Sequence, residues 1–234
     1  DEMVIFGQAM KGADAEMSLR SGRLAISRFN VADISGAALA LTGDLDGVTA
    51  GTRHDVKGRF NGSIKADRFG GILAIGGFDV PDVEGPVDIV VNGFSGEADD
   101  SDLRVDTMTL QGTLRGSRVD GVLKRRHGPA GGVDRLEIAG NAANGEGRIL
   151  LEQLGLSPRS DLSGAGTISV QLNGDTGGTY DTNFRVNVGG TTLTARGKVE
   201  APFEAIRFTG RADIAASGVM HVLGGFGAPD GLAH

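Results

Sequence analysis

Residues 56–64 read VKGRFNGSI, a run in which an apolar residue or a glycine occupies every second position and polar residues lie between them. Because successive side chains of a β-strand point to opposite faces, this period of two predicts a strand with one apolar face. Phe60 and Ile64 belong to that face, and so do Gly58 and Gly62. A glycine inside a strand weakens it unless the fold needs the missing side chain.

The same alternation, again with a glycine on the apolar side, recurs along the chain. It is clearest in residues 39–45, 108–114, 193–199 and 208–214, and shorter runs lie near 24–31, 87–91, 103–107, 119–123, 136–140, 168–172 and 184–188. We therefore expect roughly twelve to fifteen strands. Connections as short as DLDG, NG or GG favour antiparallel hairpins, since parallel crossovers need longer links.

Two explanations account for the glycines on the apolar side. Glycine permits the strong twist and curl that a long curved sheet requires. Alternatively, glycine keeps a groove open in which an extended ligand lies against the backbone. The two are compatible, because a sheet curled into a trough has both properties. The predicted fold is mainly β: a long, curled, trough-like and predominantly antiparallel sheet with a few short helices.

An internal repeat divides the chain. The stretch GGFDVPD at 76–82 returns as GGFGAPD at 224–230, and the longer segments 62–82 and 210–230 match at seven of 21 positions without a gap. A weaker copy lies at 148–161. Repeats with a period of about 70 to 80 residues indicate stacked supersecondary units.

We expect three approximate units of one repeat-built groove, at 1–82, 83–158 and 159–234. Each contains a short helical stretch, and these are predicted at 67–75, 146–154 and 215–223. In the first and third copies the Gly-Gly-Phe and the following proline end the helix.

Composition restricts the function. The net charge of −7 disfavours binding to a nucleic-acid backbone. The one basic cluster, KRRH at 124–127, is interpreted as a solvated turn rather than a contact with anionic lipid. No run approaches the roughly eighteen apolar residues of a membrane-spanning helix, and the chain begins with Asp. We therefore expect a piece of a longer or processed protein.

No catalytic pattern is present. The four histidines are scattered without metal-ligand spacing, there is no cysteine, and neither a Gly-x-Ser-x-Gly elbow nor a phosphate-binding loop occurs. The sequence therefore predicts no enzyme, no catalytic residue, no metal and no cofactor.

The apolar side of the predicted sheet is aliphatic, with one tyrosine and no tryptophan. Sugars and bases are bound on stacking rings, so such a trough suits acyl chains better. Burial of an acyl chain of about sixteen carbons gains on the order of 10 kcal/mol. The residues predicted to line the groove are Leu41, Leu45, Phe60, Ile64, Leu110, Leu114, Val170, Leu172, Val186, Leu193, Val199 and Phe208.

Three segments resemble the repeats of AsmA-like proteins of bacterial envelopes, which are related to TamB-type proteins. They are VADISGAALALTGDLDG (31–47), the segment 161–202, and FTGRADIAASGVMHVLGGFGAP (208–229). The resemblance implies a body in the periplasm of a Gram-negative cell, anchored in the inner membrane through a helix outside this chain. It further implies phospholipid as partner, carried toward the outer membrane, or a role with outer-membrane assembly proteins.

Two other functions are compatible with the sequence. One is a structural or adhesin-type β-solenoid with a closed core and no ligand, although its parallel rungs repeat every twenty to thirty residues or so. The other is a scaffold that binds a partner protein strand at an exposed sheet edge. Neither requires a lipid.

Overall fold

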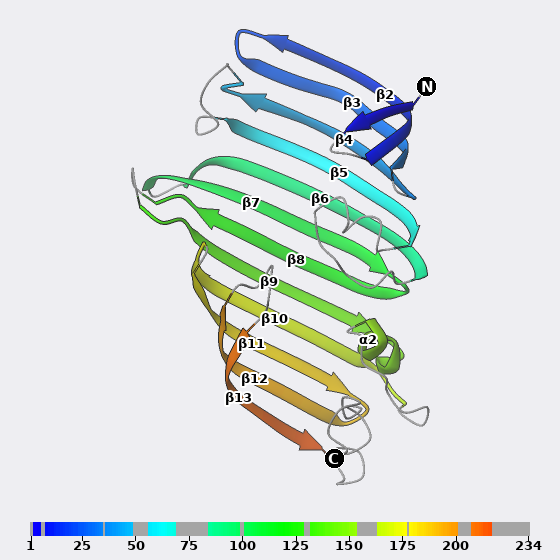
Figure 1. Ribbon diagram of the computed structural model, residues 1–234, viewed down its shortest axis with the longest axis vertical. Coiled ribbons are helices and arrows are strands. Elements are labelled where there is room, and N and C mark those ends of the chain that lie inside the picture. The colour runs from blue at the N-terminus through cyan, green and yellow to red at the C-terminus, as the bar shows by residue number, and fades with distance from the viewer. Residues whose placement is uncertain are drawn as a thin grey trace. The chain divides into compact units, whose positions relative to one another are not determined.

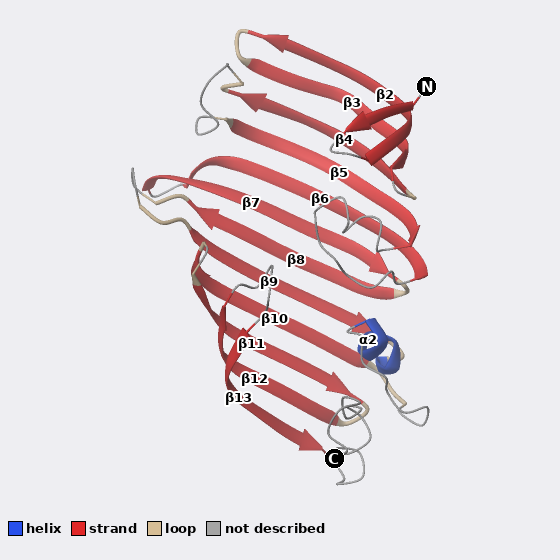
Figure 2. Ribbon diagram, viewed as in Figure 1, coloured by secondary structure: helices blue, strands red, loops and turns tan. Residues whose placement is uncertain are grey.

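The computed structural model describes most of the chain, and its described residues are 2–5, 8–34, 36–48, 56–68, 84–98, 101–128, 132–153, 163–176, 178–200 and 207–216. Within them the protein is mainly β, with thirteen strands and one short helix (Figures 1 and 2). Each strand is hydrogen-bonded to the next in chain order, and the order runs from β1 to β13 without closing. The predicted fold class, an open antiparallel sheet, is confirmed.

The chain forms two compact units, Asp1–Gly116 with Gly121–Leu136, and Ser117–Asp120 with Glu137–His234. Unit 1 contains β1 (Glu2–Ile5), β2 (Gln8–Arg20), β3 (Arg23–Ile34), β4 (Ala37–Asp46), β5 (Lys57–Arg68), β6 (Glu84–Ala98) and β7 (Ser101–Leu114). Strands β8 (Ser117–Arg126) and β9 (Arg135–Asn144) are divided between the units. Unit 2 contains α2 (Gly147–Gln153), β10 (Gly166–Asp175), β11 (Thr179–Val188), β12 (Thr191–Glu200) and β13 (Arg207–Ala216).

Tight turns explain why neighbours in sequence are neighbours in the sheet. The β2–β3 turn is Ser21 and Gly22, with φ of 48° and 80°, and the β11–β12 turn is Gly189 and Gly190, with φ of 57° and 80°. Positive φ at both central residues matches the right-handed twist of the flanking strands. Glycine adopts it without strain.

In unit 1 the register places alternate residues of each strand on a common face. Across β4 to β7, Gly43 is opposite Phe60, Phe60 is opposite Gly93, and Gly93 is opposite Met108. We name the face that bears these residues the apolar face, and the opposite one the polar face. The long strands β6 and β7 bend along their length (Figure 1).

Unit 1 has a small buried cluster near its first strands. Met10, Val31 and Ile34 are 3%, 1% and 8% exposed, and Phe29 and Leu39 pack against them. This cluster belongs to the apolar face, because Val31 is opposite Leu39 and Leu39 is opposite Ile64.

Unit 2 buries its apolar face against helix α2. Leu150 and Leu151 of the helix are 0% and 1% exposed, and Leu151 packs against Val186 and Val188 of β11. Full burial of each leucine contributes about 1.5 to 3 kcal/mol. The helix begins close to the sheet, because a Cβ atom on Gly166 would lie only 2.6 Å from the Cα atom of Gly147.

The expected helix at 146–154 is confirmed as α2. The expected helix at 67–75 begins inside strand β5, which includes residues 67–68, and residues 69–75 lie outside the described residues. The expected helix at 215–223 likewise begins inside β13, which includes residues 215–216, and residues 217–223 lie outside the described residues. Both Gly-Gly-Phe motifs also fall outside them, so the three repeat units stay a prediction. The runs 103–107 and 108–114, expected as separate strands, are the single strand β7.

The first hairpin, β1–β2, was not predicted. The alternation of β2 is broken at Gly12, whose φ is +62°, and residues 13–19 alternate regularly after it. The register shift beside Glu16 and Met17 places an extra residue in β3, because Arg28 and Ile26 are their partners. A bulge or a left-handed residue reverses the face on which later side chains lie, so the period of two is lost over a short window.

Candidate functional site

The structure brings the six predicted lining residues of unit 1 onto one face. Leu41 is opposite Gly62, which is opposite Val91, which is opposite Leu110. Since directly opposed residues of a sheet share a face, this row and its neighbours are continuous across four strands. All six are half-buried, namely Leu41, Leu45, Phe60, Ile64, Leu110 and Leu114. Unit 1 contains no helix among its described residues.

The glycines of this face accommodate their neighbours. The ring of Phe60 lies over Gly93, where a Cβ atom would collide with it, and a Cβ on Gly112 would collide with the carbonyl oxygen of Asp88. At Gly62, by contrast, the nearest atoms are 3.3 and 3.5 Å away. Close approach of rings and backbones therefore explains Gly93 and Gly112, which favours the curvature explanation over an empty groove at those positions.

In unit 2 the six predicted residues also share a face, but their exposure differs. The register sets Val170 opposite Phe184, Val186 opposite Leu193, and Val199 opposite Phe208. Val170, Leu172 and Leu193 are half-buried. Val186 is 1% and Val199 7% exposed, whereas Phe208 on β13 is 44% exposed. The helix thus withdraws Val186 from the accessible part of the face.

In each unit, one strand carries large apolar side chains that are exposed on the apolar face. In unit 1 these are Met17 and Leu19 of β2, 54% and 60% exposed, and in unit 2 they are Phe208 and Ile214 of β13. Met17 is opposite Ile26, and Ile26 is opposite Gly43, which fixes Met17 on the apolar face. The alternation of β2 was missed from the sequence, and so was this part of the face.

A polar network joins the ends of β6, β7 and β8 in unit 1. His127 Nε2 is 2.7 Å from Asp106 Oδ2, and the Ser95 hydroxyl donates to Asp106 Oδ1 at 2.6 Å. Arg104 Nε lies 3.2 Å from the same oxygen. On the other side, Arg125 donates to Asp134 at 2.8 Å. The network explains how the strand ends stay together.

This network corrects the interpretation of KRRH. Residues 124–126 belong to strand β8 rather than to a turn, and Arg125 and His127 are held by Asp134 and Asp106. The sequence does contain a signal for this pairing: an aspartate stands on each side of the basic run, at positions 106 and 134.

Both aspartates of the network stay ionised. Burial raises the pKa of Asp106, but hydrogen bonds from Ser95 and His127 and the charge of Arg104 outweigh it and hold the pKa below the ordinary aspartate value. Burial likewise raises the pKa of Asp134, and the Gly128 amide, Arg125 and His127 lower it further than burial raises it.

The arrangement does not form a nucleophile and base. Ser95 donates to Asp106 instead of to His127, whose ring nitrogens lie near two different carboxylates, at 2.7 and 3.5 Å. An activated serine needs the base itself within hydrogen-bond reach. The described residues contain no cluster of acidic or histidine side chains suited to a metal ion.

Among the residues that the structure describes, no helix has the length and hydropathy needed to cross a membrane. Comparison of the chain with family models, with curated proteins and with solved structures finds no match. The argument for function therefore depends on the geometry of the sheet itself.

Proposed function

We propose that this chain is a groove segment of an AsmA-like envelope protein, and that its apolar face binds phospholipid acyl chains and lets them pass between the inner and outer membranes. A supporting role in outer-membrane assembly is part of the same proposal. The protein would lie in the periplasm and be anchored in the inner membrane outside this chain.

One observation carries the proposal. In unit 1, half-buried aliphatic side chains form continuous rows across β4 to β7, and no described helix of that unit packs on them. Large exposed apolar surfaces on soluble proteins mark binding sites for other molecules. A row that runs across strands fits a long, narrow apolar ligand better than a compact one.

The chemistry of the face favours acyl chains. Most of its side chains are aliphatic, and the ring of Phe60 lies over Gly93. Polar groups occur at one end of the face, where Gly58 is opposite Ser95 and Ser95 is opposite Asp106. Each methylene that leaves water gains about 0.8 kcal/mol wherever it lies along the rows. An acyl chain bound in this way has little preference for one position along the rows, and a ligand that moves along the face requires such weak preference.

The test replaces Leu110 and Leu114 with aspartate in the full chain. Both lie on the apolar face of β7, opposite Val91 and Val87. Photo-crosslinking with a phospholipid that carries a diazirine in its acyl chain should label the wild type and lose most of its signal in the variant. Complementation in cells by the full-length protein should fail in parallel.

The matched control places two aspartates on the polar face of the same strand, at Thr109 and Gln111, opposite Asn92 and Val90. It should label like the wild type. A second variant with threonine at 110 and 114 keeps β-propensity and removes part of the apolar surface, and circular dichroism reports whether each variant folds. Unchanged labelling of the folded Leu110 and Leu114 variants would contradict the proposal.

The antiparallel register disagrees with a parallel β-solenoid within the described residues. The protein-binding scaffold has one observation in its favour: strand β13 ends the strand order, and nearly all its residues are exposed. A purified chain that takes up no phospholipid but captures a peptide strand along β13 would replace the lipid proposal with that one.

A further inference from the structure

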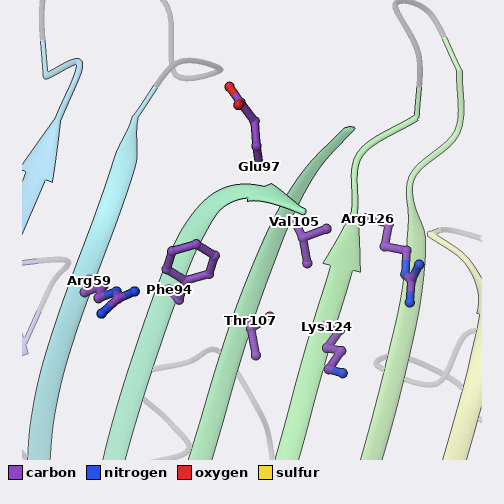
Figure 3. Close-up of a pocket in the computed structure, with 7 residues that line it drawn as sticks. All are labelled: Arg59, Phe94, Glu97, Val105, Thr107, Lys124 and Arg126. Atoms are coloured by element: carbon purple, nitrogen blue, oxygen red, sulfur yellow. The ribbon is translucent and has the colours of Figure 1, made fainter. Parts of the chain in front are cut away.

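A pocket of about 490 Å³ opens on the polar face of unit 1 (Figure 3). It is lined by Arg59, Phe94, Glu97, Val105, Thr107, Lys124 and Arg126. Arg59, Phe94 and Thr107 each adjoin in sequence a residue of the apolar face, and successive side chains of a strand point to opposite sides. The pocket is therefore separated by the sheet from the surface that carries the proposed function.

Four strands supply its side chains in register. Arg59 is opposite Phe94, and Phe94 is opposite Thr107. The His127 amide donates to the carbonyl oxygen of Arg104 at 2.9 Å. Because β7 and β8 are antiparallel, this hydrogen bond places Arg126 opposite Val105 and Lys124 opposite Thr107. One row therefore runs from Arg59 through Phe94 and Thr107 to Lys124.

The position of the Phe94 ring in the pocket depends on a neighbouring glycine. Gly96 is buried, and a Cβ atom there would lie 2.5 Å from Cζ of Phe94, so the ring leans over the glycine. The ring is 38% exposed. The Arg59 guanidinium stands 5.4 Å from its centroid, a cation–π distance that orients the planar donors beside the ring.

The charge of the pocket is opposite to that of the chain. Three cations, Arg59, Lys124 and Arg126, meet one carboxylate, Glu97, in a protein of net charge −7. Glu97 is already paired with Lys57, which lowers the pKa of that carboxyl group by a hydrogen bond and by charge. Lys124 has no ion pair among the described residues of unit 1. Among the side chains that line the pocket, the cations therefore outnumber the anions.

We propose that this pocket binds a phosphate group that is attached to an apolar moiety. The guanidinium groups present forked donors that match phosphate oxygens, and the Lys124 ammonium adds a point charge. The exposed ring of Phe94 and the side chain of Val105 receive the apolar part. The phosphate ester is either the headgroup region of a phospholipid or a soluble phosphate ester, and this site does not depend on the lipid groove.

The experiment is isothermal titration calorimetry of the full chain with two probes, monomeric dihexanoyl phosphatidic acid and inorganic phosphate. The lipid should bind about tenfold more tightly than phosphate, because the ring adds apolar contact, and its affinity should fall as salt is raised. Lys124→Gln should weaken both probes about fivefold. Phe94→Leu should weaken the lipid and leave inorganic phosphate unchanged.

Two controls keep the result specific. Lys198→Gln removes an exposed lysine in unit 2 and should bind both probes like the wild type. The Leu110 and Leu114 aspartate variant is compared with inorganic phosphate only, which has no acyl chain for the apolar face, and should bind it like the wild type. Equal binding by Lys124→Gln and Lys198→Gln would overturn the site. Equal affinity for phosphate and lipid, with no effect of Phe94→Leu, would overturn the apolar part and assign the pocket to free phosphate.

Discussion

The two units cover their apolar faces differently. In unit 2, helix α2 packs on β10 and β11 and leaves Val186 and Val188 only 1% and 3% exposed. In unit 1 no helix lies among the described residues, and Leu41 and Leu110 stay half-buried. Strands with the same alternating pattern are therefore covered by a helix at Val186 and Val188 in one unit, and in the other they carry half-buried side chains without a described helix over them.

The difference teaches that the strand pattern does not decide whether a face is core or binding surface. A sheet face becomes core only when another element supplies side chains to fill the space above it. Leu150 and Leu151 do this in unit 2. The following predictions test how far the two faces differ.

The largest effect is expected for Leu151→Ala. Leu151 is 1% exposed and contacts Val186 and Val188, so the variant loses both the transfer free energy and the packing around a cavity, about 3 kcal/mol. Leu110→Ala in unit 1 should cost about 1 kcal/mol, because the side chain is already partly in water. Hydrogen exchange of the β11 and β7 amides measures each loss in its own unit. Similar losses at the two sites would mean that both faces are closed.

The next effect concerns Gly93→Ala. A Cβ atom at Gly93 would collide with the Phe60 ring, so the ring must move, at a cost of about 1 to 2 kcal/mol in the free energy of unfolding. Gly62→Ala is the less crowded control, since its Cβ atom would lie 3.3 Å from the nearest atom, the carbonyl oxygen of Ala40. Combining Gly93→Ala with Phe60→Leu should recover most of the loss in urea denaturation. An additive double variant would show that ring and glycine are not coupled.

A pH effect of smaller size is expected at Asp106. Its pKa in the folded state lies below that of the unfolded chain, so the carboxylate stabilises the fold above about pH 4, the usual aspartate value. This stabilisation is lost as the pH falls through the lower, folded pKa. Asp106→Asn should therefore lower stability at pH 7 and flatten the acid side of the stability profile. An unchanged slope below pH 4 in the variant would contradict this.

The smallest effect is expected on the polar face. Lys65 and Asp88 form an ion pair of 3.3 Å, but their side chains are 66% and 55% exposed. Exposed pairs contribute little, so Lys65→Gln should change the free energy of unfolding by less than about 0.5 kcal/mol. Thermal melts of this variant and the wild type should overlap within a few degrees. A larger change would mean that the polar face contributes to stability as the covered apolar face does.

Most strands could be predicted because their side chains alternate strictly. Gly58, Phe60, Gly62 and Ile64 predicted β5 and its apolar side, and the register confirms that they share a face. The β1–β2 hairpin was not predicted, since the left-handed Gly12 interrupts the period of β2 and leaves only the short alternating run 13–19 after it. A sequence pattern predicts which side chains share a face only where the backbone of the strand is regular.

The candidate sites divide in the same way. The twelve residues predicted to line a groove followed from periodicity, and those of each unit lie on one face of it. The network of Asp106, His127 and Asp134 and the pocket beside Phe94 combine residues from several strands. No local signal relates Arg59 to Lys124, because their proximity is set by the registers of three strand pairs.

The amino-acid sequence by itself determined most of the strands after β2, their antiparallel succession and which of their side chains share a face, because these depend on local periodicity and turn chemistry. Only the tertiary structure decided that Val186 lies under a helix while Leu110 remains accessible, and that Arg59, Phe94 and Lys124 meet in one pocket. Burial and charge clustering depend on which elements pack together, and that is a property of long-range contacts.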